Sequence, residues 1–276
     1  AVAMGFRRLE LGLSDAPPMM NGFEDTRRET GIEVTSLISG CLKPRSDKMA
    51  SHQLASTDDD EREQALNSVR RHVQMARRLG SKTVVLSCNS VADRKLNQES
   101  EELERRLQRE GKSEELVLKL RAHVQKIQKR GQRQVDHLCR SLHSLLTEFQ
   151  GLTLAVEPGQ QVDDLLSFEA MGWVLGDLSK HGLAYWHDVG RIHQLELHGL
   201  PGQGEWLDAY APRMVGIHLQ DSAGMEFEMP PGRGEVDFRL LAEYVPKEAA
   251  RVLEVNPRHG RAELLASVQY LVDVGF

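Results

Sequence analysis

The chain has 276 residues, 40% of them apolar, which is enough to bury one large core, so we expect a single domain over residues 1–276. Its 35 Lys and Arg residues stand against 41 Asp and Glu residues, a formal net charge of −6. That balance argues against nucleic acid, whose phosphate backbone is bound by basic faces, and favours a small-molecule ligand.

Cysteine usage and apolar content predict the compartment. The three cysteines are far apart and none stands in a CxxC motif, so neither a disulfide framework nor a thiolate zinc site is indicated. No apolar stretch reaches the roughly 18 residues that span a bilayer, and no charged and then apolar leader opens the chain. We therefore expect a cytoplasmic protein with no membrane segment.

Short apolar or β-branched runs alternate with amphipathic helical segments along the chain. Such alternation predicts βαβ units and a parallel sheet, whose strands are buried on both faces. A barrel and a doubly wound sheet both satisfy the pattern, and the strand count favours a barrel that lacks one element. The predicted strands cover residues 9–13, 32–38, 83–86, 152–156, 183–187, 214–219 and 251–255.

Two segments depart from a regular alternation. Residues 1–6 have the pattern of a helix tail that turns at Gly5 into a strand, so we expect the first strand and most of its helix to precede residue 1. Residues 93–150 predict an extended helical segment, with a charged stretch over 99–133, a turn at Gly111 and an amphipathic stretch over 135–149. A solvated helical hairpin, a dimer arm and a lid over the barrel mouth are the alternatives for this segment.

Four predicted strands end in a residue type that binds metal ions. Glu157, Asp188, His218 and Glu254 follow one another at separations of 31, 30 and 36 residues, each close to the length of one βα unit. Barrels build their sites from the carboxyl ends of several strands. Three carboxylates and an imidazole would raise one another's proton affinity unless a cation neutralised them. The pattern therefore predicts one divalent metal ion, Mn, Co, Mg or Zn.

Three motifs resemble a known family: Tyr-Trp-His-Asp-Val-Gly at 185–190, Gly-Ile-His-Leu-Gln-Asp at 216–221 and Pro-Gly-Arg-Gly-Glu-Val-Asp-Phe at 231–238. From residue 6 to the end, the chain resembles the xylose-isomerase-like TIM-barrel superfamily, which includes sugar isomerases and epimerases, inosose dehydratase and the apurinic-site endonucleases. The resemblance implies an α/β fold of the (β/α)8 TIM-barrel type. It also implies that the four strand-end residues hold the metal, and that Glu157 and Glu254 flank the substrate and move its proton.

The sequence departs from the family pattern in two places. Relatives commonly have Asp-x-Gly-His after the strand that ends at Asp188, and here Arg191 stands at the His position. An Asp-His pair that helps the endonucleases bind further zinc ions is replaced within residues 224–228. Both departures argue against an endonuclease.

Four further residues are candidate substrate contacts. Arg191 and Arg258 could receive an acidic or phosphorylated group, although a salt-bridging surface arginine is the alternative for each. Trp186 shares the inward side of its strand with Asp188, so it either walls the pocket or packs in the core. Asp221, three residues after His218, could orient a metal ligand or bind substrate.

The function that these residues predict is a metal-dependent isomerase or epimerase of a small sugar or related hydroxy-carbonyl compound. Glu157 and Glu254 would transfer the proton through an enediolate. The alternatives are an inosose-type dehydratase, an apurinic-site endonuclease-like phosphodiesterase, and a barrel that binds a ligand without turning it over. By analogy with the family, a homo-oligomer is also an expectation.

Overall fold

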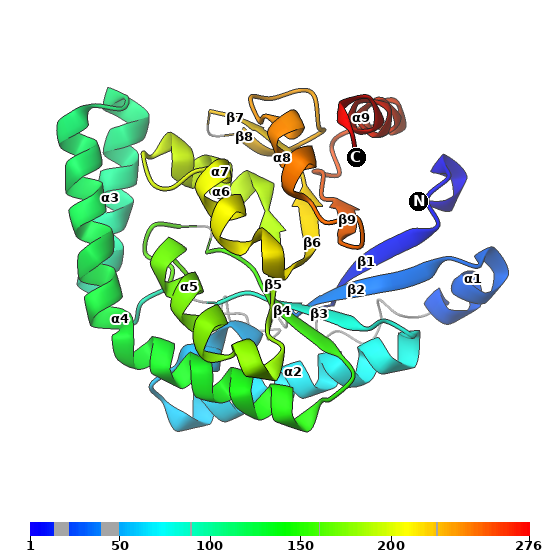
Figure 1. Cartoon of the computed structure of the whole chain (residues 1–276), viewed down its shortest axis with the longest axis horizontal. Coiled ribbons are helices and arrows are strands. Elements are labelled where there is room, and N and C mark those ends of the chain that lie inside the picture. The colour runs from blue at the N-terminus through cyan, green and yellow to red at the C-terminus, as the bar shows by residue number, and fades with distance from the viewer. Residues whose placement is uncertain (14–21, 40–49, 89, 160, 225) are drawn as a thin grey trace. The chain divides into compact units, whose positions relative to one another are not determined.

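Parallel strands and helices alternate along the computed structural model, which describes residues 1–13, 22–39, 50–88, 90–159, 161–224 and 226–276 (Figure 1). The chain divides into two units. The first holds residues 1–89, 134–156 and 177–184, and the second holds residues 90–133, 157–176 and 185–276. The expected single domain stays a prediction.

The predicted strands agree with the observed ones to within two residues at each end. The strands are β1 (Arg8–Leu13), β2 (Glu33–Ser39), β3 (Thr83–Leu86), β4 (Thr153–Val156), β5 (Ala184–Asp188), β6 (Met214–Leu219), β7 (Asp221–Ala223), β8 (Glu226–Met229) and β9 (Ala250–Leu253). The helices are α1 (Phe23–Thr30), α2 (Asp59–Leu79), α3 (Arg94–Glu110), α4 (Glu114–Glu148), α5 (Phe168–Asp177), α6 (Val189–Leu197), α7 (Gln203–Tyr210), α8 (Phe238–Tyr244) and α9 (Arg261–Val274). Short 3₁₀ helices lie at Val2–Met4, Ala50–Ala55, Ser179–His181 and Ala211–Arg213.

In the first unit, β1, β2, β3 and β4 pair in that order, each parallel to the next. Helix α2 contacts β2 and β3 with an apolar stripe whose spacing follows the helical period. Asp58 caps its first turn by accepting a hydrogen bond from the Glu61 amide at 2.9 Å. Gly80, at φ 78°, ends it in the left-handed conformation that glycine adopts without strain.

In the second unit, β5, β6 and β9 pair in that order, again all parallel. All five residues of β5 are buried, as expected for a parallel strand covered on both faces. Strands β7 and β8 form a separate antiparallel hairpin after β6, which was not predicted from the sequence. This hairpin contributes to the site described below.

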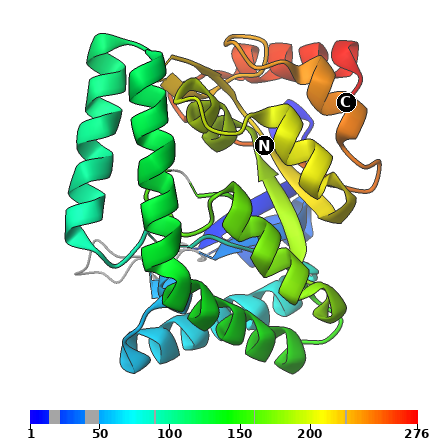
Figure 2. The same ribbon diagram turned by 60° about the vertical axis from the view of Figure 1, so that its left-hand side comes forward.

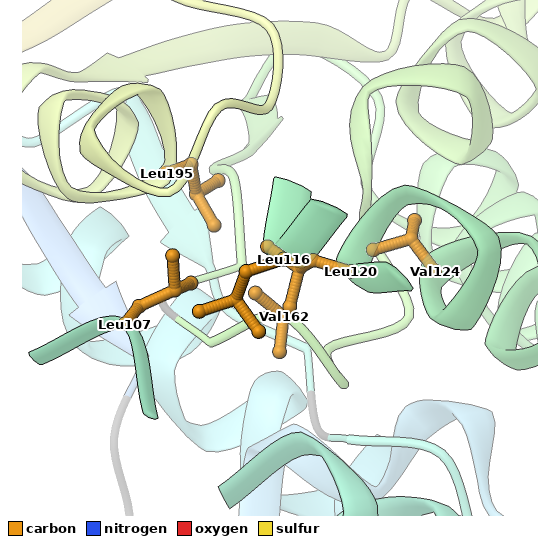
Figure 3. Packing of buried hydrophobic residues seen from close by; sticks show 6 residues of the cluster. All are labelled: Leu107, Leu116, Leu120, Val124, Val162 and Leu195. Carbon is orange, nitrogen blue, oxygen red and sulfur yellow. The ribbon is translucent and has the colours of Figure 1, made fainter. Parts of the chain in front are cut away.

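The helical segment forms a hairpin: α3 and the first part of α4 run side by side and antiparallel (Figure 2). Gly111 ends α3, as predicted, and α4 then continues without a break into the amphipathic stretch predicted over 135–149. The inner face of the hairpin is not solvated, because its leucines pack with Val162, from the loop after β4, and with Leu195 of α6 (Figure 3). Within the part of the chain that the structure describes, no helix is both long and apolar enough to cross a membrane.

Candidate metal centre

The four predicted ligand residues all lie in the second unit, at or just beyond strand ends. Asp188 is the last residue of β5 and pairs in register with His218 of β6. Glu254 follows β9 directly and extends its ladder, since its amide donates to the Leu219 carbonyl at 3.2 Å. Glu157 is the residue after β4 and is fully buried.

The side chains of these residues converge on one point. His218 Nδ1 lies 3.6 Å from Glu157 Oε2, 3.5 Å from Asp188 Oδ2 and 3.6 Å from Glu254 Oε2. One ligand atom from each of Glu157, Asp188 and His218 falls within 4.8 Å of the others. Ligand atoms bound about 2.1 Å from one ion lie about 3.0 to 3.4 Å apart, so this spacing fits a shared divalent cation. The donor set also fits, because carboxylates and imidazole suit Mn, Mg, Co or Zn.

Asp188 is held by the backbone as well as by side chains. Its Oδ1 accepts a hydrogen bond from the Arg191 amide at 3.0 Å and so caps the N-terminus of α6. This bond fixes the carboxylate so that Oδ2 faces His218. The helix cap thus positions a candidate ligand.

Arg191 lies against the same cluster. Its guanidinium contacts Glu157 Oε1 at 2.8 Å and Asp188 Oδ2 at 3.1 Å, and it donates to the Pro158 carbonyl at 3.1 Å. The contact to Glu157 uses Oε1 and leaves Oε2 facing His218. Arg191 is therefore a fixed cation beside the candidate metal position.

The environment separates the pKa values of two of the carboxyl groups. Burial acts to raise the pKa of Asp188, but Arg191 and His218 lower it more, and its net shift is downward. Burial raises the pKa of Glu254 to about 7; His218 opposes the rise, and the Asp188 and Glu157 carboxylates add to it. In the metal-free protein, Glu254 therefore takes up a proton more readily than Asp188 does.

The raised pKa of Glu254 predicts a pH-dependent stability of the metal-free protein. Because the folded pKa of about 7 lies above the ordinary value of 4.5, this group stabilises the fold below pH 4.5, and the contribution is lost as pH rises through 7. With a chelator present, we expect the Tm of the wild type to fall between pH 5 and pH 8 relative to that of Glu254→Gln. Thermal unfolding at both pH values measures this, and an equal Tm difference at both would contradict it.

A small cavity of about 50 Å³ adjoins the cluster and is lined by Asp188, Gly190, Arg191, Gln194, Gln220, Phe227, Glu228 and Glu254. Phe227 and Glu228 come from β8, so the β7–β8 hairpin forms one wall. A larger cavity of about 290 Å³ lies elsewhere in the second unit, beside α4 and α7. None of the four predicted ligands lines the larger cavity, so the smaller one is the candidate substrate site.

Gln220, Gln194 and Glu228 line the candidate site, and none of them was predicted from the sequence. A signal existed for Gln220: side chains two residues apart on a strand point the same way, so Gln220 continues the side that carries His218. Nothing comparable marks Glu228, whose place depends on a hairpin that was not predicted.

Three of the predicted substrate contacts lie outside this cavity. Trp186 is fully buried and packs on His218, with ring centroids 5.1 Å apart. Asp221 accepts hydrogen bonds from five backbone amides of residues 222–236, and so holds the loop after the β7–β8 hairpin. Arg258 is exposed and pairs with Glu226. Only Arg191 of the four lines the cavity.

Parallel strands that alternate with helices define an α/β protein, and a cluster of carboxylates and an imidazole lies at the ends of its strands. A family model described as xylose isomerase-like TIM barrel matches residues 1–271. The chain belongs to this family, which confirms the predicted fold and the resemblance. Seven parallel strands of this fold are described.

Solved structures of similar fold include several sugar epimerases. A D-psicose 3-epimerase from Clostridium cellulolyticum H10, with D-tagatose, is 14% identical, with a TM-score of 0.68 over 99% of this chain and 90% of that one. The 3-keto-D-glucoside 4-epimerase YcjR from E. coli is 15% identical, with a TM-score of 0.64 over 99% and 91%. The IOLI protein with a bound zinc atom is 14% identical, with a TM-score of 0.62 over 99% and 89%. The comparison with curated proteins found no match.

Proposed function

We propose that the chain is a divalent metal-dependent isomerase or epimerase of a small sugar or related hydroxy-carbonyl compound. The observation that carries the proposal is the placement of His218 Nδ1 between 3.5 and 3.6 Å from one carboxylate oxygen each of Glu157, Asp188 and Glu254. Two of the structures of similar fold are named as sugar epimerases, and this supports a sugar as the class of substrate.

Glu157, Asp188, His218 and Glu254 would hold the ion. When bound, a divalent cation supplies Lewis acidity that acidifies the carbon-bound hydrogen beside a substrate carbonyl. Mn, Co, Mg and Zn all suit this donor set.

The residues of the chain itself would then move the proton. Glu254 is one-third exposed and lines the cavity, so its carboxylate can reach a substrate carbon and remove the proton. Glu157, which comes from another strand end, would return the proton to the neighbouring carbon or to the other face of the same carbon. Arg191 would contact the substrate from the cavity wall and offset the negative charge that develops on it.

The nearest reaction in chemical terms is that of an inosose-type dehydratase, because the same acid and base could expel a hydroxyl group after proton removal. Neither an apurinic-site phosphodiesterase nor a non-catalytic barrel would remove a carbon-bound proton. A measurement of proton removal from carbon would therefore be positive for an isomerase, an epimerase or a dehydratase. It would be negative for a phosphodiesterase and for a non-catalytic barrel.

Exchange of carbon-bound hydrogen with solvent tests the proposal. The protein is incubated in D₂O with Mn²⁺ and, in turn, D-psicose, D-tagatose, D-fructose and an inosose, and deuterium in the recovered sugar is measured by mass spectrometry. We expect deuterium beside the carbonyl of at least one of them, and none after treatment with a chelator. Metal-loaded protein that exchanges none of these compounds would contradict the proposal.

A further inference from the structure

A buried glutamine contacts two of the candidate ligand carboxylates at once. Gln220 follows β6 directly and is 4% exposed. Its Nε2 donates to Asp188 Oδ1 at 3.2 Å and to Glu254 Oε2 at 3.1 Å. Its Oε1 accepts a hydrogen bond from the Glu228 amide at 2.9 Å. Both ends of the side-chain amide are thus used at the site.

The two carboxylates depend on Gln220 to different degrees. Asp188 Oδ1 already accepts from the Arg191 amide, so Gln220 is a second donor there. Glu254 lies beyond the end of β9, and among the described residues Gln220 is the one hydrogen-bond donor to its carboxylate. We therefore expect Gln220 to matter most for the orientation of Glu254.

The side-chain oxygen of Gln220 connects the two carboxylates to the cavity wall, because it accepts the hydrogen bond from Glu228. Glu228 adopts φ 55°, the one positive φ among the described non-glycine residues, a conformation that side-chain-bearing residues rarely adopt. Its backbone is held there by the bond to Gln220 and by the Asn256 amide, which donates to the Glu228 carbonyl at 2.8 Å. Gln220 thus joins the β8 wall of the cavity to two carboxylates on other strands.

The charge of the donor also matters. Arg191 already places a positive charge on Glu157 and Asp188. A second cation at position 220 would compete with a divalent ion for the same carboxylates. A neutral amide orients the carboxylates and leaves their charge available to the ion.

Gly190 makes room for this arrangement. A Cβ atom at Gly190 would lie 2.5 Å from both Cδ and Oε1 of Gln220, closer than atoms approach without moving. Gly190 lies in the first turn of α6, where alanine suits the backbone. An alanine at position 190 would therefore displace the side-chain amide of Gln220, although Gln220 itself is not substituted.

From these contacts we infer that Gln220 is the positioning residue that presents Asp188 and Glu254 to the metal ion and couples them to the β7–β8 hairpin. The inference rests on the proposed metal site. Gln220 would not contact the ion itself, because its side-chain amide donates to the carboxylate oxygens of Asp188 and Glu254.

Metal affinity tests the inference. Isothermal titration with Mn²⁺ is compared for the wild type, Gln220→Met, which keeps the length of the side chain without its hydrogen bonds, and Gly190→Ala. Loss of an outer partner of metal ligands costs about 10- to 100-fold in affinity, and we expect a Kd raised by that factor in both variants. Thermal unfolding with a chelator checks that each variant is folded.

Two matched controls separate positioning from general destabilisation. Gln128→Met removes a half-buried glutamine outside the candidate substrate site, whose Nε2 donates to Ser167 Oγ at 2.9 Å and to Glu169 Oε2 at 2.6 Å and to no predicted ligand. Gly204→Ala adds a methyl group to a glycine of α7, at a position where no atom lies within 4 Å of the added Cβ. Both are expected to bind Mn²⁺ with nearly the Kd of the wild type.

The outcomes distinguish the two proposals. If Gln220→Met and Gln128→Met weaken Mn²⁺ binding equally, or if Gln220→Met has no effect while the wild type binds, Gln220 does not position the ligands and the proposed function stands. If the wild type itself binds no Mn²⁺, the metal site and the role of Gln220 are both wrong.

Discussion

Glu254→Gln is expected to lower the rate of solvent deuterium exchange into an active sugar by about 10²- to 10⁴-fold, the range that a positioned general base contributes. The amide keeps an oxygen where Glu254 Oε2 faces His218 but cannot accept a proton near neutral pH. Glu157→Gln is expected to block conversion to product to a similar degree, because it removes the group that would return the proton. Exchange and conversion are measured on the same metal-loaded samples.

The control for these variants is Glu243→Gln, which makes the same chemical change at an exposed position of α8. It should leave exchange and conversion unchanged. Full turnover in either Glu157→Gln or Glu254→Gln, with the metal content of the wild type, would show that the residue does not transfer the proton.

His218→Ala is expected to abolish metal binding. Among the described residues, His218 alone has an atom within 3.6 Å of all three carboxylate groups, so its loss would remove the imidazole nitrogen on which the other three candidate ligands converge. Elemental mass spectrometry of protein purified without chelator should find about one equivalent of Mn, Co, Mg or Zn per wild-type chain and almost none in the variant.

The same variant should remove the stabilisation that metal gives. An ion at 100 times its Kd stabilises the folded state by about 2.7 kcal/mol, which raises Tm by several degrees in a chain of this size. We expect added Mn²⁺ to raise the Tm of the wild type and not that of His218→Ala. His198→Ala, which removes a buried histidine at the end of α6, is the control and should keep its metal. Metal retained by His218→Ala would contradict the assignment of this ligand.

Much of the fold could be predicted because buried parallel strands and amphipathic helices leave strong periodic patterns. The same patterns brought out Glu157, Asp188, His218 and Glu254, since each is a polar residue where an apolar strand stops. The structure brings these four together, as predicted. Their role as ligands stays a proposal.

The rest of the site depends on contacts that periodicity does not encode. Asp221 was selected for its distance from His218 along the chain, but its two oxygens are used by backbone amides of the following loop. That loop closes tightly because Gly232 adopts φ 88° and Gly234 leaves room for the Asp221 carboxylate. The neighbouring Gln220 reaches the carboxylates of Asp188 and Glu254 because β6 directs its side chain to the same side as that of His218.

The helical segment shows the same limit. Its charge density suggested a solvated hairpin, yet leucines spaced along α3 and α4 form a buried cluster with Val162 and Leu195. Sequence periodicity located the apolar stripe, but it could not show which segments would cover it. The dimer arm and the lid stay untested predictions.

Arg191 has a consequence for how the protein matures. Its guanidinium pairs with Glu157 and Asp188, so part of the negative charge of the cluster is balanced by the chain itself. A cluster that depended wholly on an ion would repel itself until that ion arrived, and folding would wait for metal supply. We expect this chain to fold first and to load its ion afterwards. Metal supply would then control how many copies are active and leave the number of folded copies unchanged.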